Sequence, residues 1–347
     1  MTIATREQLL SEVLKDQPAF RIRQCEEAVF QVANTSWDDV TSLPATTREV
    51  LKTHVPWITV QEKIMQQSAK LDTFKALLTL SDETEIESVL MKNARGAWTI
   101  CVSSQVGCAM RCGFCATGKM GLTRSLTRDE IVDQYRFWQK FLKEHPELPP
   151  RISNVVFMGM GEPLANYTEV RAAINTWLAQ TDLGRTRITV STVGVLPRLE
   201  QILTDPEWPH VRLAVSLHSA VQETRKSIVP TSFDDFLPRI ADWSKRYLDI
   251  HGNRRHHLTF EYVMLRGVND SKEDARALHK FVTRIGNVRV NLIPYNFTGG
   301  EFFATTDERL KIFFDELGAH GVTVTVRKTM GDDIAAACGQ LSVVASV

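Results

Sequence analysis

Residues 101–121 read CVSSQVGCAMRCGFCATGKMG, and within them Cys108, Cys112 and Cys115 form a C-x3-C-x2-C triplet. The triplet follows the apolar segment 98–103, which we expect to be the first strand in a series of strand–helix units. Loops at the carboxyl ends of parallel strands meet at one edge of an α/β fold, and ligands bind there. The triplet therefore lies where a binding or catalytic site is expected.

Three closely spaced thiolates suit an iron–sulfur cluster. Each can bind one iron of a cubane 4Fe–4S cluster and leave the fourth iron open to an external ligand. The alternative is a structural zinc site in which Cys101 supplies a fourth thiolate. Structural zinc sites usually combine two separated C-x2-C pairs, so the spacing favours the cluster while zinc stays open as an alternative.

Beyond residue 96 the sequence alternates between strand-like and helix-like patterns. Six apolar segments have strand character, and they span residues 98–103, 154–158, 187–192, 211–217, 258–264 and 288–293. Most are followed by a helical pattern, and one of these helices begins with the capping box Thr127 to Glu130. Six such units predict an α/β fold with a parallel sheet, either doubly wound or a partial barrel.

The chain divides into two predicted domains. Short amphipathic helices over 5–16, 20–33 and 46–55 predict a helical accessory domain with its linker in residues 1–72, with Cys25 in its core. Two apolar runs on either side of Ser81-Asp82 predict a hairpin. The hairpin begins the catalytic domain, residues 73–347, which also includes the segment around Cys338.

The composition narrows the class of protein. The 347 residues include 41 Lys plus Arg and 41 Asp plus Glu, which excludes a polycation and an acidic tail, so if nucleic acid is a partner, it must meet a local basic patch. The N-terminal residues lack the apolar stretch of a signal peptide, and no run reaches the roughly 18 apolar residues of a membrane-spanning helix. We expect a cytoplasmic monomer without membrane attachment and with reduced thiols.

Several sequence blocks resemble one family. Besides the triplet block they are GMGEPLAN, VSTVGV, SLHS, EYVMLRGVND, NLIPYN and GDDIAAACGQL, and they span residues 87 to 340. Together they resemble the radical S-adenosylmethionine (SAM) enzymes that methylate C2 of adenine in RNA, and their C8-methylating antibiotic-resistance relatives. The helical start with QPAFRIRQ is similar to the accessory domain of this family. The resemblance implies a partial (β/α)6 barrel, a 4Fe–4S cluster on the triplet and SAM as cofactors.

The resemblance also implies which residues hold SAM. Taken alone, the Gly-Glu pair would be an ordinary turn after a strand, and His218 would be a histidine at the rim of the sheet with its hydrogen bonds satisfied. The family pattern instead assigns SAM contacts to Gly161, Glu162, Ser191, Ser216, Leu217, His218 and Asn296.

Two further cysteines acquire roles from the same resemblance. Cys338 is expected to receive a methyl group from a first SAM, and a second SAM is cleaved to the radical that takes hydrogen from this methyl group. The resulting methylene adds to the adenine ring, and Cys101 then attacks the Cys338 sulfur, which frees the product and forms a disulfide. Glu87 matches the proton acceptor of the family, although a glutamate on a strand is more often on a solvated face. An electron donor such as flavodoxin is implied.

The implied substrate is an adenosine of 23S rRNA and also of tRNA. The base must be unstacked to enter a pocket, which favours a loop. Alternatives are C8 methylation, another RNA target, a radical SAM enzyme acting on a small molecule or protein, and a zinc-stabilised RNA-binding protein. Residues 220–223 and 227–238 depart from the family pattern, which leaves the substrate-facing loop open. Candidate phosphate contacts are Arg21, Arg23, residues 254–257, Arg327 and Lys328.

Overall fold

The computed structural model describes residues 3–93, 95–252 and 258–343 of the chain. Its main feature is one ten-stranded sheet whose spatial order follows the order of the strands along the chain. The strands are β1 (Val60–Gln67), β2 (Thr73–Leu80), β3 (Glu85–Lys92), β4 (Trp98–Cys101), β7 (Ile152–Phe157), β8 (Ile188–Thr192), β9 (Arg212–Ser216), β10 (Leu258–Met264), β11 (Arg289–Pro294) and β12 (Thr323–Val326).

The sheet has a parallel part and an antiparallel part. The strands from β4 to β12 are parallel to their neighbours, whereas β1, β2, β3 and β4 pair antiparallel. The six strands predicted from the sequence are β4 and β7 to β11, and the expected hairpin is β2 with β3. The strands from β4 to β12 follow one another in chain order, without the reversal of order found in a doubly wound sheet, and the sheet is open between β1 and β12. The predicted partial barrel is therefore confirmed in preference to a doubly wound sheet.

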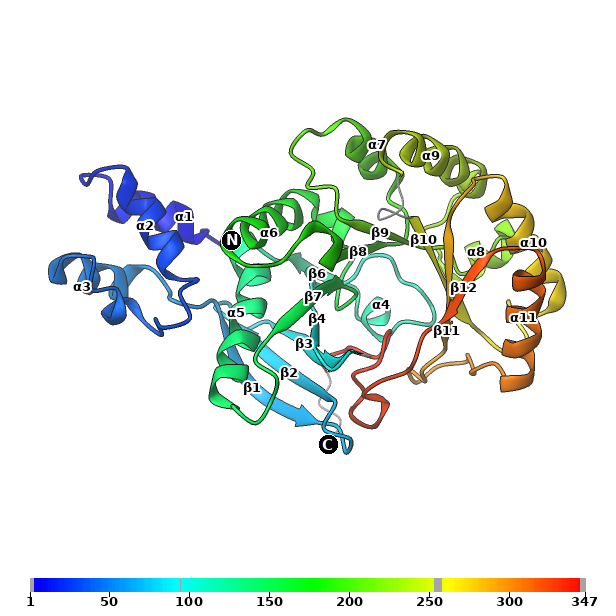
Figure 1. Cartoon of the computed structure of the whole chain (residues 1–347), viewed down its shortest axis with the longest axis horizontal. Helices are drawn as coiled ribbons and strands as arrows, with labels where there is room; N and C mark the ends of the chain where they lie inside the picture. The colour runs from blue at the N-terminus through cyan, green and yellow to red at the C-terminus, as the bar shows by residue number, and fades with distance from the viewer. Residues whose placement is uncertain (1–2, 94, 253–257, 344–347) are drawn as a thin grey trace.

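Helices lie on the outside of the curved sheet, with the short α4 in the middle of the fold between β4 and β11 (Figure 1). The helices after the triplet are α4 (Ala116–Met120), α5 (Arg128–Glu144), α6 (Tyr167–Gln180), α7 (Leu196–Thr204), α8 (Gln222–Ile228), α9 (Phe236–His251), α10 (Lys272–Thr283) and α11 (Asp307–Ala319). A small second sheet pairs β5 (Gln105–Gly107) with β6 (Leu122–Ser125) around the triplet. None of the helices in the described ranges has the length and apolar character that a membrane crossing requires.

Two strands at the edges of the sheet were not predicted. β1 pairs with β2, so the sheet begins before the domain boundary expected at residues 72 and 73. Its residues VQEKIMQQ are mostly polar and exposed, as suits an edge strand, and they lack the apolar alternation on which the prediction relied. We therefore propose that the catalytic domain starts near residue 60. β12, with four residues, is shorter than β1 and is also mostly exposed.

The first part of the chain forms a helical unit, and its role as an accessory domain stays a prediction. Its helices are α1 (Arg6–Val13), α2 (Phe20–Ala28) and α3 (Ala45–His54). The short 3-10 helix η1 (Trp37–Asp39) lies between α2 and α3 along the chain. They enclose a hydrophobic core separate from that of the sheet, with Cys25, Trp37 and Leu51 among its members. Cys25 is thus buried where the sequence placed it.

A buried ionic network joins the accessory domain to α5. Arg6 contacts Asp133 at 2.5 Å and Asp129 at 3.5 Å, and Arg136 contacts the other oxygen of Asp133 at 2.6 Å. Thr59 also donates its backbone N–H and its hydroxyl to Asp133. Because breaking such a buried pair leaves an uncompensated charge, this network fixes the accessory domain against the barrel.

Candidate active site

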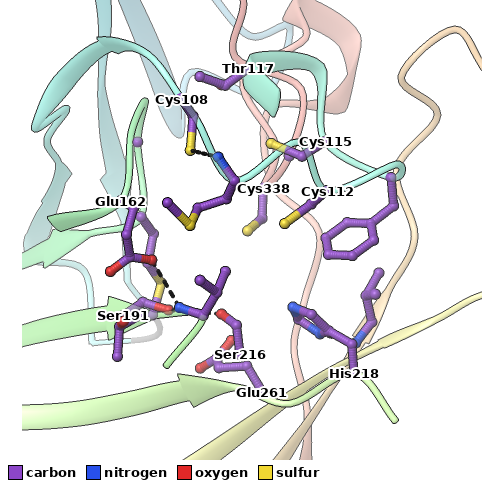
Figure 2. A pocket seen from close by; sticks show the side chains of 18 of the residues that line it. Cys108, Cys112, Cys115, Thr117, Glu162, Ser191, Ser216, His218, Glu261 and Cys338 are labelled. Atoms are coloured by element: carbon purple, nitrogen blue, oxygen red, sulfur yellow. Dashed lines mark hydrogen bonds between the residues drawn. The ribbon is translucent and has the colours of Figure 1, made fainter. Parts of the chain in front are cut away.

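A cavity of about 130 Å³ opens at the carboxyl ends of the parallel strands. Figure 2 shows side chains from the triplet loop on one side of it and from β8, β9 and β10 on the other. Of the residues predicted from the sequence, those lining this cavity are Cys108, Cys112, Cys115, Gly161, Glu162, Ser191, Ser216, His218 and Cys338. The structure thus gathers residues from across the chain at one place.

The backbone of the triplet loop turns tightly between Cys108 and Cys115. Arg111 adopts a left-handed conformation with φ of 54°, and the amide of Cys115 donates to the carbonyl of Cys112 at 3.1 Å. α4 then begins directly after Cys115, and a Cβ added at Gly118 would lie 3.0 Å from the Cys112 backbone. The tight loop directs all three sulfur atoms toward the cavity (Figure 2).

The donor set fits an iron–sulfur cluster better than a single metal ion. Within the described residues no three His, Cys, Asp or Glu side chains are placed to hold one ion. A cubane takes one thiolate on each of three different irons, so it suits sulfurs that share a cavity without converging on a point. Cys101 does not line this cavity, and the zinc alternative that needs it as fourth ligand therefore lacks support.

Burial keeps Cys108 and Cys112 protonated until a metal arrives. Desolvation raises the pKa of Cys108 to about 12, although the amide of Met110 opposes the shift. Desolvation and the two neighbouring thiols also raise the pKa of Cys112. Since a metal binds the thiolate, cluster binding must release protons from this loop.

Gly161 and Glu162 form the turn after β7. Gly161 has φ of 98°, and a Cβ there would lie 2.6 Å from the Gln105 side chain, so glycine is required. The carboxylate of Glu162 accepts from the amides of Leu164 and Val193, both at 2.9 Å, and so connects the ends of β7 and β8. Burial raises the pKa of Glu162 and these hydrogen bonds oppose the shift. Its carboxyl group also lines the cavity and can receive a hydrogen bond from a ligand.

The opposite wall consists of polar side chains at the ends of β8 and β9. The hydroxyls of Ser191 and Ser216 lie 3.4 Å apart. Nδ1 of His218 accepts the amide of Val263 at 3.1 Å, and Phe114 meets the imidazole edge to face at 4.7 Å. Burial lowers the pKa of His218 to about 3, so the ring is neutral and its proton is on Nε2. Leu217 is fully buried and does not line the cavity.

A second cavity of about 60 Å³ lies beside the first, and it is lined by Cys101, Asn296, Arg327 and Cys338 among others. Cys338 belongs to both cavities. Burial and the neighbouring Cys338 raise the pKa of Cys101 to about 12, and the guanidinium of Arg327 opposes the shift. Cys101 and Cys338 therefore share a pocket. All six cysteines are free, so the disulfide expected from turnover is absent from this structure.

The segment that carries Cys338 is held from several directions. The side-chain amide of Asn296 donates to the carbonyl of Cys338 at 3.2 Å. From the triplet side, the amide of Ala116 donates to Gly339 at 2.8 Å and the hydroxyl of Thr117 donates to Leu341 at 2.6 Å. These bonds place Cys338 next to the triplet although nearly the whole catalytic domain separates them in sequence.

Glu87 has a different position from the one expected of a solvated strand residue. Its side chain is buried on β3, where Lys75 contacts Oε1 at 2.9 Å and the amide of Ser342 donates to Oε2 at 2.7 Å. Burial raises the pKa of Glu87, with Lys75 opposing the shift. Glu87 lines neither cavity and instead anchors the end of the Cys338 segment.

Arg327 was predicted to contact phosphate; in this structure its side chain is paired with an acid, and the phosphate contact stays a prediction. Its guanidinium lines the inner cavity and lies 3.1 Å from the carboxylate of Glu261, which itself lines the first cavity. Sequence reasoning missed Glu261, although an acidic residue inside the apolar strand β10 is an unusual signal. Arg21 and Arg23 lie on α2, where Arg21 bonds Gln24. Residues 254–257 lie outside the described residues.

Comparison with known proteins agrees with this geometry. The model of the radical SAM superfamily matches residues 102–279. The dual-specificity RNA methyltransferase RlmN of Oleidesulfovibrio alaskensis is 37% identical over 98% of this chain and 94% of its own length. A probable dual-specificity RNA methyltransferase RlmN of Corynebacterium diphtheriae is 40% identical over 94% and 88%, respectively. The crystal structure of a radical SAM methyltransferase from Sphaerobacter thermophilus superposes with a TM-score of 0.88 at 36% identity, covering 97% of both chains.

Proposed function

Since the chain belongs to the radical SAM superfamily and to its dual-specificity RNA methyltransferases of the RlmN type, and is a SAM-dependent RNA methyltransferase, we propose that it methylates C2 of an adenosine through a methyl group carried on Cys338. The proposed substrates are 23S rRNA and tRNA, with two SAM consumed per methyl transferred. The observation that carries this proposal is the position of Cys338, which lines both the cavity of the triplet and the cavity of Cys101.

The triplet would hold the 4Fe–4S cluster, and the residues around it would hold SAM. When bound, the two groups supply an electron and a carbon radical able to abstract hydrogen from a methyl group. Glu162, Ser191, Ser216 and His218 face the same cavity with acceptor or donor groups suited to the polar parts of SAM. Leu217 can contribute only through its neighbours, because its side chain is buried away from the cavity.

Asn296 is better suited to another task than a direct contact to SAM. It does not line the cavity of the triplet, and its amide holds the carbonyl of Cys338. We assign it to positioning the carrier cysteine.

Cys338 and Cys101 would perform consecutive steps. Cys338, as a thiolate, takes the methyl group from the first SAM by displacing its sulfonium sulfur. After the methylene carbon is bonded to the adenine ring, the ring would lose its hydrogen as a proton and give its unpaired electron back to the electron carrier, and the thiolate of Cys101 would then attack the Cys338 sulfur. The sulfur–sulfur bond forms as the sulfur–carbon bond breaks, and the freed carbon takes up a proton to complete the methyl group. An electron donor such as flavodoxin would supply the reducing electrons.

Glu87 remains our candidate for the proton acceptor, with one condition set by its contacts. Its carboxylate is occupied by Lys75 and by the amide of Ser342, and the Cys338 segment covers it. Proton transfer from RNA would therefore require the chain near Ser342 to release Glu87 when the base enters.

The test of this function is mass analysis of 23S rRNA and tRNA from cells with and without the gene. The proposal predicts one adenosine that carries an added methyl group at C2 only when the gene is present. A methyl group at C8 would place the chain with the C8-specific relatives, and unchanged adenosines in both RNAs would overturn the proposal.

A further inference from the structure

α8 carries a buried arginine that the proposed reaction leaves without a task. Arg225 is 1% exposed, and its guanidinium donates to three backbone carbonyls at the ends of β8 and β9. They belong to Ser216 at 2.8 Å, to Leu217, and to Val193 at 2.7 Å. The ring of Phe236 lies 3.9 Å from its central carbon, and Nε is buried without a hydrogen-bond partner.

This charge has no counter-ion of the ordinary kind. Among the described residues no carboxylate lies within ion-pair distance of Arg225, unlike Arg6, Arg136 and Arg327, which all face an acid. Carbonyl dipoles solvate a guanidinium in part, but a buried charge without a counter-charge is strongly unfavourable. Arg225 is therefore a buried positive charge that a negatively charged group bound nearby would stabilise.

The triplet loop is next to this charge. The amide of Gly113 donates to the carbonyl of Ile228, the last residue of α8, at 3.0 Å. Cys112 packs with Ile228 and Val229 in one hydrophobic cluster. Burial lowers the pKa of Arg225 to about 9, and a thiolate at Cys112 opposes the shift. α8 thus backs directly onto one of the three cluster ligands.

We propose that Arg225 is the built-in counter-charge of the iron–sulfur cluster and raises its reduction potential. The inference rests on the proposed function only in that a 4Fe–4S cluster must occupy the triplet. Three thiolates on an oxidised cubane leave a net charge of minus one, and one added electron makes it minus two. A fixed cation beside Cys112 stabilises the more negative state more strongly, so it favours uptake of the electron from the donor.

The experiment is a potentiometric titration of the anaerobically reconstituted protein, followed by the electron paramagnetic resonance signal of the reduced cluster, without SAM or RNA. The variants are Arg225→Met and Arg225→Gln, which remove the charge, and Arg225→Lys, which keeps it. The control is Arg239→Met, because Arg239 also lies over a phenylalanine, Phe233 at 5.3 Å, but is exposed on α9. Iron content is measured for every variant.

The neutral variants should be harder to reduce. At a fixed potential their ratio of reduced to oxidised cluster should fall at least tenfold, about 59 mV for a one-electron couple. Arg225→Lys should recover most of this ratio, and Arg239→Met should match the parent protein. If both neutral variants fail to bind iron while Arg225→Lys binds it, the counter-charge role is supported through cluster assembly.

Other outcomes would overturn the inference. They are an unchanged potential in iron-loaded Arg225→Met or Arg225→Gln, an equal shift in Arg239→Met, or loss of iron in Arg225→Lys as well, which would indicate a packing role. A parent protein that binds no iron would instead count against the proposed function itself.

Discussion

Cys338 and Cys101 line the same small cavity, and Cys338 also lines the larger cavity onto which the cysteine triplet opens. One sulfur atom is therefore within reach of the site proposed for SAM and of a second thiol. A carrier that had to travel between separate sites would need a mobile segment, whereas here the backbone around Cys338 is held by Asn296, Ala116 and Thr117. The structure favours a carrier that changes partners while its backbone stays in place.

Replacement of Cys338 should separate two activities. Cys338→Ala should abolish RNA methylation but retain the cluster and the reductive cleavage of SAM, because Cys338 is not a member of the triplet. The measurements are iron content, 5′-deoxyadenosine formation and methyl incorporation into RNA. Cys25→Ala, in the core of the accessory domain, is the matched control and should keep all three. Methylation at the normal rate by Cys338→Ala would show that the carrier role is wrong.

Replacement of a triplet cysteine should remove the cluster itself. Cys112→Ala should bind little iron after anaerobic reconstitution and lose the broad charge-transfer absorption, since each thiolate holds a different iron. Cys101→Ala should retain the brown colour, because Cys101 lines the other cavity. Stoichiometric zinc without iron in the parent protein would contradict the assignment of the triplet.

Arg327 should control the thiol of Cys101. Burial and the nearby Cys338 raise the pKa of Cys101 to about 12 and Arg327 lowers it, so Arg327→Met should raise it further. Each unit by which the pKa of Cys101 rises reduces its thiolate fraction at neutral pH about tenfold, and product release should slow in the same proportion. Because the thiolate fraction of Cys101 rises with pH, product release measured in a single turnover should accelerate from pH 7 to pH 9 in Arg327→Met.

Two comparisons keep this prediction specific. Arg327→Lys retains a cation beside the two thiols and should recover much of the rate. A pH-independent release rate in Arg327→Met, or a rate equal to that of the parent, would mean that the guanidinium has no influence on Cys101.

The sequence carried enough information for the catalytic half of the fold. Six parallel strands and the triplet could be predicted because buried strands are apolar and because cysteines at fixed spacing have few uses. The edge strand β1 could not be predicted, since its solvent-facing residues follow no apolar period. The inward orientation of Arg327 depends on how β12 lies against β11, which is a tertiary property.

The site shows the same division between local and tertiary information. The residues at strand ends could be placed because parallel strands end at one edge. The burial of Glu87 could not, because it depends on the chain near Ser342 returning over β3 from the far end of the sequence. The role proposed for Arg225 could not be predicted from the sequence either, because it depends on α8 packing against Cys112 in the folded protein.

The buried ionic network between the accessory domain and α5 should contribute strongly to the stability of the protein. Asp133→Asn should lower the free energy of unfolding by about 3–5 kcal/mol in urea denaturation, because Arg6 and Arg136 would lose their shared buried partner. Asp182→Asn, in the exposed pair with Arg151, is the control and should change little. Equal stability of the two variants would show that the buried ionic network does not hold the accessory domain against the barrel.

The same buried ionic network should weaken in acid. Burial opposes ionisation of Asp133, but Arg6 and Arg136 outweigh it and lower the pKa below the ordinary value. A depressed pKa contributes stability that is full above the unfolded value of about 3.9 and is lost as the pH falls through the folded value. Asp133→Asn should therefore flatten the acid limb of the stability curve below about pH 4. An unchanged acid limb would argue against an ionised Asp133.

The most direct test of the account is anaerobic turnover of Cys101→Ala with SAM, reductant and substrate RNA, followed by mass analysis of the protein. Thiolate attack by Cys101 is the proposed release step, so removal of Cys101 should leave the RNA bonded to the enzyme through Cys338 after carbon–carbon bond formation. We predict a stoichiometric protein–RNA adduct at Cys338 that is absent from Cys101→Ala,Cys338→Ala. Free methylated RNA, formed over many turnovers by Cys101→Ala without an adduct, would contradict the account.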